Sequence, residues 1–490
     1  MSLMILGTSS HAGKTTIVTA VCRCLSNRGL KVAPFKSQNM SLNSYITPDG
    51  KEIAISQAVQ SFAARISPCA DTNPILLKPK GNSTSQIILF GEPYKDAKIA
   101  DYYKETDYLL EKAVEAYRRL EKEYGNIVVE GAGGAAEVNL YSRDIANILL
   151  AKKLRIPIVI VGDIERGGIF AQLIGTYDLL PDEVRKNVCG FIVNKFRGDS
   201  ELFREGVKII EEKTGVDVLG VIPYTATELP SEDSLSLYDK RSRDFPVKIA
   251  VMKIFGLSNF NDFELLERYA CLDYVTPGTS LKDYDCIIIP GTKNTVEALL
   301  ELKSHGFSDE IADARRRKIP IIGICGGYQM LCRKIHDEGI ESGSKADYEG
   351  FGLFDAVTTF AEYKKTTVQV TRKVNKIGAI LSGADTVSGY EIHMGQTDTG
   401  SEEKALEGEG CVSADGLVIG TYMHGLFSNA NISQSLLKYL YSQKGLTFAG
   451  INDEDIGYDK ALNELAQHFE ANTDFEKILA HFDTTRIRTD

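Results

Sequence analysis

The chain has 490 residues, a formal net charge of -11 at pH 7 and an isoelectric point of about 5.4. An acidic chain lacks the basic field that general binding to nucleic acid or to an anionic membrane requires, and no apolar run reaches membrane-spanning length. The 9 cysteines show no CxxC pair and no metal-ligand spacing, so we expect a cytoplasmic protein without a disulfide framework or zinc site.

The predicted strands fall into two series, and a chain of this length is too long for one ordinary core. Continuous apolar runs are typical of parallel strands covered by helices; they lie at residues 3–6, 32–35, 127–129, 156–161, 190–193 and 218–222, and again at 247–251, 286–289, 319–324 and 416–422. We predict an α/β fold with two doubly wound, mostly parallel-sheet domains. The expected divisions are 1–230, a linker at 231–246, a second domain at 247–445 and a small helical tail at 446–490.

The sequence GTSSHAGKTT at residues 7–16 follows the first strand and opens a helix. In that context backbone amides, a lysine and a hydroxyl can cradle phosphates and magnesium. Thr8 stands where the strict pattern has its first glycine. A helix-capping turn is the alternative, but it gives no reason for Lys14 and Thr15 to follow the glycine. The residues expected to bind ATP are Thr8, Ser9, Ala12, Gly13, Lys14, Thr15 and Thr16.

Magnesium prefers hard oxygen ligands, and three residues are candidates beside the phosphates. Thr15 is one. Glu130 ends a predicted strand, so its carboxylate should emerge at the carboxyl edge of the sheet. Glu52 is predicted to open a helix, and it is a candidate because it resembles the acidic ligand of dethiobiotin synthetase, whose phosphate loop is similar to residues 7–16. The alternative is an acid that only complements the helix dipole.

The sequence IPIIGICGGYQM at residues 319–330 predicts a buried strand that stops at Cys325 and restarts as a helix. Such a turn holds a thiol up as a nucleophile, and the helix N-terminus favours the thiolate. The alternative is a buried structural cysteine. The backbone N–H groups of Gly326 and of Gly291, in the turn after residues 286–289, are the expected donors to an oxyanion.

A nucleophilic cysteine needs a base. His424 ends an apolar strand 99 residues after Cys325 and is the predicted base. His393 competes, but it lies within a strand of alternating residues, where a structural or substrate-positioning role is favoured.

These motifs resemble two known domain families. The phosphate loop resembles that of dethiobiotin synthetase, and the Cys325 and His424 segments resemble a class I glutamine amidotransferase domain. In most of that superfamily a glutamate two residues beyond the histidine orients it, whereas Leu426 stands here. The group that orients His424 is therefore unassigned.

Taken together, residues 1 to about 440 resemble the cobyric acid synthase family, the glutamine-hydrolysing corrinoid-amidating enzymes of cobalamin biosynthesis. The motifs that carry the resemblance are FKSQNM at 35–40, NPILLKP at 73–79, GDIERGG at 162–168, NKFRGD at 194–199 and SNF at 258–260. The loop departs mildly from the family pattern at His11 and Ala12.

The resemblance implies ATP- and glutamine-dependent amidation of the b, d, e and g carboxylates of adenosylcobyrinic acid a,c-diamide through acyl phosphates, with Mg²⁺ as cofactor and ammonia from Cys325. Candidate corrinoid contacts are Lys36, Gln38, Asn39, Arg166 and Lys195. Two alternatives remain: a cobyrinic acid a,c-diamide synthase, and a nucleotide-switched protein of the partition ATPase type, which would have no use for a cysteine elbow. The sequence leaves the oligomeric state and the ammonia route open.

Overall fold

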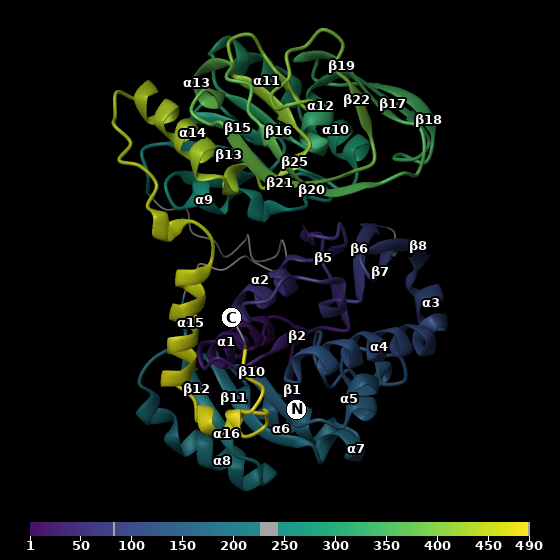
Figure 1. Cartoon of the computed structure of the whole chain (residues 1–490), viewed down its shortest axis with the longest axis vertical. Coiled ribbons are helices and arrows are strands. Elements are labelled where there is room, and N and C mark those ends of the chain that lie inside the picture. Colours follow the sequence, from purple (N-terminus) through teal and green to yellow (C-terminus); the bar gives the residue numbers. More distant parts are fainter. Residues whose placement is uncertain (82–83, 226–243, 489–490) are drawn as a thin grey trace. The chain divides into compact units, whose positions relative to one another are not determined.

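The computed structural model describes residues 1–81, 84–225 and 244–488, and the chain divides into two compact units (Figure 1). The first unit contains Met1–Ser41, Lys51–Pro230 and Tyr458–Asp490, and the second contains Leu42–Gly50 and Ser231–Gly457. Most of the linker expected at 231–246 lies outside the described residues. Within the described residues, no helix has the length and apolar character needed to cross a membrane.

The first unit is built on a six-stranded sheet with the order β12-β11-β10-β1-β9-β2, and every pairing in it is parallel. Its strands are β1 (Ser2–Gly7), β2 (Ala33–Phe35), β9 (Ile127–Glu130), β10 (Ile158–Asp163), β11 (Val188–Phe196) and β12 (Val218–Pro223). The side chains of β1 and β10 are buried along their whole length, as a sheet covered on both faces requires.

A smaller sheet with the order β3-β6-β7-β8 completes the first unit and is antiparallel except between β3 and β6. It contains β3 (Gln38–Met40), β6 (Ile75–Gly81), β7 (Thr84–Leu89) and β8 (Glu92–Lys98), and the short strand β5 spans Glu52–Ala54. The helices up to the linker are α1 (Lys14–Asn27), α2 (Ile55–Ala63), α3 (Ile99–Tyr102), α4 (Thr106–Tyr124), α5 (Ile148–Leu154), α6 (Ile169–Leu179), α7 (Asp182–Arg185) and α8 (Arg204–Thr214).

The end of the chain returns to the first unit as α15 (Asp459–Ala471) and α16 (Phe475–Leu479). Helix α15 runs along α1, where the buried Arg23 guanidinium donates to Asn463 Oδ1 at 2.9 Å and pairs with Asp459 (Figure 1). Leu462, Leu465 and Phe469 are buried from this helix at helical spacing. The tail therefore forms part of the core around α1.

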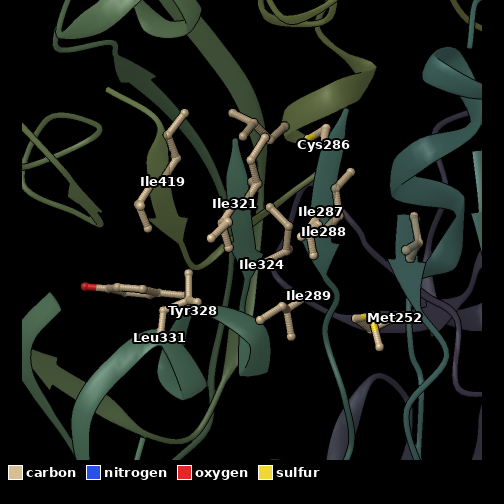
Figure 2. Packing of buried hydrophobic residues seen from close by; sticks show 14 of the residues in the cluster. Met252, Cys286, Ile287, Ile288, Ile289, Ile321, Ile324, Tyr328, Leu331 and Ile419 are labelled. Atoms are coloured by element: carbon tan, nitrogen blue, oxygen red, sulfur yellow. The ribbon is translucent and has the colours of Figure 1, made fainter. Parts of the chain in front are cut away.

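The second unit has its own six-stranded sheet with the order β14-β13-β15-β16-β24-β23, parallel except for the short edge strand β23. Its strands are β13 (Lys248–Met252), β14 (Cys271–Val275), β15 (Cys286–Ile289), β16 (Ile321–Ile324), β23 (Cys411–Val412) and β24 (Val418–Thr421). Figure 2 shows the isoleucines of β15 and β16 packed side by side with Tyr328 and Leu331 from the helix after β16.

Two further sheets belong to the second unit, with the orders β18-β17-β19-β22 and β20-β21-β25. Their strands are β17 (Cys332–Glu338), β18 (Lys345–Glu349), β19 (Phe354–Phe360), β20 (Thr366–Lys373), β21 (Thr386–His393), β22 (Gln396–Asp398) and β25 (Met423–His424). The helices are α9 (Glu264–Glu267), α10 (Thr295–Ser304), α11 (Phe307–Arg316), α12 (Gly326–Leu331), α13 (Gly378–Leu381) and α14 (Ala430–Gln443).

The predicted fold class is confirmed, because both units contain a mostly parallel sheet with helices around it. The helix start predicted at Glu52 is wrong. Glu52 lies in strand β5 and α2 begins at Ile55. A backbone bond from Glu52 N to Gly91 O (3.1 Å) and a buried ion pair with Lys78 hold Glu52 in the extended conformation.

Candidate active sites

The phosphate loop lies between β1 and α1, as its sequence predicted. Gly13 precedes the helix with φ of +101°, a left-handed conformation that favours glycine. A Cβ atom on Gly13 would lie 2.0 Å from Asn194 Nδ2, and that amide donates to Ala12 O at 3.0 Å. Asn194, near the end of β11, thus fixes the backbone of the loop at Ala12 and Gly13. Thr8 is held by a hydrogen bond from its hydroxyl to Gln172 Oε1 (3.2 Å), Ser9 is exposed and Thr16 is half-buried.

Lys14 is buried, and its ammonium donates to two backbone oxygens, Ser9 O at 2.9 Å and Gly133 O at 2.7 Å. Both acceptors belong to loops that follow parallel strands, the phosphate loop after β1 and the glycine loop after β9. A phosphate between these loops would offer the ammonium anionic oxygens in place of carbonyls, and the stronger charge-assisted bonds would favour that exchange.

Glu130 is the centre of a polar cluster beside the loop. Its side chain is fully buried and accepts bonds at Oε1 from the Thr15 hydroxyl (2.8 Å) and from the Lys36 ammonium (2.7 Å), while Gln60 donates to Oε2. Three sequence-predicted residues, Thr15, Lys36 and Glu130, therefore meet at one place. A buried carboxylate requires such partners, because removing an unpaired charge from water is costly.

Two of the three predicted magnesium ligands fit a common site. The Thr15 hydroxyl and the Glu130 carboxylate are hard oxygen donors within hydrogen-bond distance of each other. No group of three or more His, Cys, Asp or Glu side chains among the described residues could hold a metal ion, so a magnesium ion here would depend on nucleotide phosphates for its other ligands. The third candidate, Glu52, is buried and forms an ion pair with Lys78.

The candidate corrinoid contacts differ in burial and in their hydrogen-bond partners. Asn39 is buried and donates to Gln57 Oε1 (2.9 Å), and Gln38 accepts from the Tyr102 hydroxyl. Lys195 donates to Asp163 Oδ2 (2.9 Å) and His11 O (2.7 Å) beside the phosphate loop. Arg166 is exposed.

The cysteine elbow of the second unit has the predicted form. Strand β16 ends at Ile324, α12 begins at Gly326, and Cys325 between them has φ of +52° and ψ of -108°. A non-glycine residue with positive φ is strained, and strain of this kind is concentrated at functional sites. A Cβ atom on Gly327 would lie 1.9 Å from Ile289 O, so the bend also depends on that glycine.

His424 and a carboxylate that the motif reasoning missed complete the constellation. His424 Nδ1 lies 2.7 Å from Asp262 Oδ2, and Asp262 Oδ1 accepts from Gly425 N at 2.9 Å. Both side chains are buried. Asp262 is therefore a carboxylate placed to orient His424, as Leu426 cannot be. The available signal was an acid two residues beyond the SNF motif at 258–260.

The charge state of His424 follows from its neighbours. Burial disfavours the imidazolium, but the Asp262 carboxylate and then the hydrogen-bonded Cys325 thiol outweigh burial and raise the pKa of His424 from 6.5 to about 10. His424 thus interacts with both Cys325 and Asp262, an arrangement that suits a nucleophile, a base and an orienting acid.

The proposed oxyanion turn lies against the same histidine. A Cβ atom on Gly291 would lie 2.8 Å from His424 Cε1, and one on Gly326 would lie 3.3 Å from Thr292 N. The structure therefore brings Gly291, Gly326, His424 and Cys325 together. His393 has different contacts. Its Nδ1 lies 2.8 Å from Gly395 O, and its ring stacks on Tyr422 with the ring centroids 3.7 Å apart.

Comparison with known proteins gives a domain match for each unit. Residues 3–236 match the CobQ/CobB/MinD/ParA nucleotide-binding domain, and residues 248–432 match the CobB/CobQ-like glutamine amidotransferase domain. A probable cobyric acid synthase from Methanosphaerula palustris is 60% identical over 479 residues, which cover 98% of each chain. The chain belongs to the cobyric acid synthase family. The corresponding protein from Methanoculleus marisnigri is 59% identical over 486 residues, covering 98% of this chain and 99% of that one.

Both candidate sites lie within the matched domains. The nucleotide-binding match contains the phosphate loop and Glu130, and the amidotransferase match contains Cys325, His424 and Asp262. A more distant relative from Methanosarcina barkeri, also a probable cobyric acid synthase, is 54% identical over 480 residues and covers 98% of that chain.

Proposed function

We propose that this chain amidates the b, d, e and g carboxylates of adenosylcobyrinic acid a,c-diamide to give cobyric acid, with glutamine as nitrogen donor and ATP as energy source, in the cytoplasm. The carrying observation is the presence, in one chain, of a cysteine–histidine–aspartate series and of a phosphate loop with a buried carboxylate beside it. Nearly full-length similarity to probable cobyric acid synthases supports the substrate.

The first unit would activate the substrate. A carboxylate is a poor acyl donor, so transfer of the ATP γ-phosphoryl to it creates an acyl phosphate that ammonia can attack with release of phosphate. Lys14, moved from its two carbonyl partners, would stabilise charge on the phosphoryl oxygens. Thr15 and Glu130 would hold Mg²⁺, which when bound supplies further charge neutralisation at the phosphates. Lys36, Gln38, Asn39, Arg166 and Lys195 are proposed to meet the corrinoid.

The second unit would release ammonia. Transfer of the thiol proton to His424 gives the thiolate–imidazolium pair that the raised pKa of His424 favours, and the Cys325 thiolate attacks the side-chain amide carbonyl of glutamine. The N–H groups of Gly291 and Gly326 would donate to the oxyanion. As the tetrahedral intermediate collapses, its nitrogen takes the proton from the imidazolium and leaves as ammonia, and the thioester of Cys325 remains. Water then hydrolyses the thioester to glutamate.

Mass spectrometry of the corrinoid product tests the proposal. Incubation with the a,c-diamide, ATP, Mg²⁺ and glutamine should add an amide at four carboxylates. A product amidated only at the a and c positions of cobyrinic acid would assign the chain to the alternative, cobyrinic acid a,c-diamide synthase.

The division of labour is tested by Cys325→Ala. This variant should lose amidation with glutamine by more than about 10³-fold but keep amidation with ammonium salts. Cys271→Ala, which removes another thiol from the second unit, is the matched control and should retain both activities. Equal loss of both activities in Cys325→Ala would contradict the assignment.

A further inference from the structure

A short segment from the first half of the chain lies in the glutaminase unit. Residues Leu42–Gly50 are flanked on both sides by chain of the nucleotide-binding unit, yet they pack with Ser231–Gly457. The segment contains strand β4 (Ser44–Ile46). Ile46 forms a buried cluster with Tyr390 and Ile392, and Gln369 Nε2 donates to Ile46 O at 2.7 Å. The segment is thus built into the second unit by both apolar and polar contacts.

The segment reaches the catalytic histidine through Asn259. The backbone N–H of Ser44 donates to Asn259 Oδ1 at 2.8 Å, and Asn259 Nδ2 lies 3.4 Å from His424 Nε2. An N–H can only donate, so the Asn259 oxygen must face Ser44 and its amide nitrogen must face the imidazole. Asn43 Oδ1 accepts from Phe260 N at 3.3 Å, which secures the backbone directly after Asn259.

The segment also reaches His424 through Tyr390. The Tyr390 hydroxyl donates to Ser44 O at 2.9 Å, and its ring lies nearly parallel to the imidazole, with centroids 5.4 Å apart and an interplanar angle of 18°. His424 therefore has Asp262 at Nδ1, Tyr390 over one face and Asn259 beside Nε2. Two of these neighbours, Tyr390 and Asn259, are held by the backbone of Ser44.

We propose that Asn43 and Ser44 are positioning residues for glutamine hydrolysis, which orient the Asn259 amide and the Tyr390 ring against His424. The inference rests on the proposed function, because it concerns how Cys325 and His424 hydrolyse glutamine. The Tyr390 ring against one face and the Asn259 side chain beside Nε2 restrict the orientation of the imidazole, and so the direction from which Nε2 can exchange a proton with the thiol. Glutamine hydrolysis then depends on a segment whose two ends continue into the ATP-binding unit.

The test uses the full-length enzyme with Asn43→Ala, Ser44→Pro, which removes the N–H donor, and Asn259→Asp. Asp49→Ala is the matched control, because Asp49 is an exposed residue of the same segment. Three quantities are measured: glutamate release from glutamine, amidation with ammonium salts, and the pH dependence of Cys325 alkylation by iodoacetamide.

Asn43→Ala and Ser44→Pro should lower kcat for glutamine about 10-fold or more, with little change in KM, while amidation with ammonium is retained. Asn259→Asp places a carboxylate beside Nε2 and should move the alkylation profile by about one pH unit or more toward higher pH. Asp49→Ala should match the unmodified enzyme in all three.

Wild-type glutamate release and a wild-type alkylation profile in Asn43→Ala and Asn259→Asp would overturn the positioning role and leave the proposed function intact. If Ser44→Pro fails to fold, seen as loss of amidation with ammonium, these two variants decide. Failure of the unmodified enzyme to release glutamate at all would instead overturn the proposed function.

Discussion

Replacement of Asp262 by asparagine tests the charge balance of the glutaminase site. The pKa of His424 rises from 6.5 to about 10 with Asp262 and Cys325 beside it. Each pKa unit corresponds to about 1.4 kcal/mol, so the pair stabilises the imidazolium by something on the order of 5 kcal/mol. Asparagine keeps the shape and an acceptor oxygen but removes the charge. Burial, no longer opposed by a carboxylate, should then lower the pKa of His424.

The expected catalytic effect of Asp262→Asn is a loss of roughly 10²- to 10⁴-fold in kcat for glutamine, with amidation from ammonium unchanged. Iodoacetamide alkylation of Cys325 at pH 7 should slow by about 10-fold or more, because fewer thiolates form without a stable imidazolium. Asp309→Asn, an exposed carboxylate on α11 of the same unit, is the matched control and should change neither rate.

The same variant makes a stability prediction with a definite sign. A histidine whose pKa is raised in the folded state contributes stability that is fully present below pH 6.5 and is lost as the pH rises through about 10. Asp262→Asn should therefore lower the free energy of unfolding by several kcal/mol at pH 6 and by much less at pH 10. Urea denaturation at the two pH values measures this. An equal loss at both would refute the charge argument.

Three further changes address the other contacts. Lys14→Ala should reduce amidation with either nitrogen source by about 10²-fold or more, and normal use of ammonium would show that phosphoryl transfer occurs elsewhere. Glu130→Gln breaks the buried ion pair with Lys36 and should lower the free energy of unfolding in urea by about 3–5 kcal/mol. It should also raise the Mg²⁺ concentration needed for the half-maximal rate, and an unchanged Mg²⁺ requirement would show that Glu130 is not a metal ligand. Gly327→Ala places a methyl group 1.9 Å from Ile289 O and should destabilise the second unit by about 1–3 kcal/mol, measured by thermal denaturation. An unaltered Tm would mean that the backbone at the elbow can move to accommodate the methyl group.

Local patterns in the sequence were sufficient for the strands of the first parallel sheet, for four strands of the second, and for the phosphate loop and the elbow, but they did not predict β14 and β23. Continuous apolar runs, a glycine before Lys14 and a glycine pair after Cys325 each specify a local backbone conformation. Asp262 could not be reached in this way, because its bond to His424 joins residues 162 positions apart and depends on how η6 (Phe260–Phe263) packs beside β25.

The start of α2 shows the opposite case, in which a local pattern misled. The residues after Glu52 permit a helix, but strand β5 and the pair between Glu52 and Lys78 keep residues 52–54 extended. Tertiary contacts of a buried charge outweigh a few tenths of a kcal/mol of helix propensity per residue.

The interleaved connectivity of the two units limits how this enzyme can be divided or recombined. A cut near residue 230 would leave Leu42–Gly50 with the ATP-binding fragment and Tyr458–Asp490 with the glutaminase fragment, so each piece would lack a strand or helix of its own core and carry one that belongs to the other. An exchange of glutaminase units between relatives that moved only residues 231–457 would therefore pair a foreign His424 with a native Ser44. In a compatible chimera, residues 42–50 must therefore come from the same parent as residues 231–457.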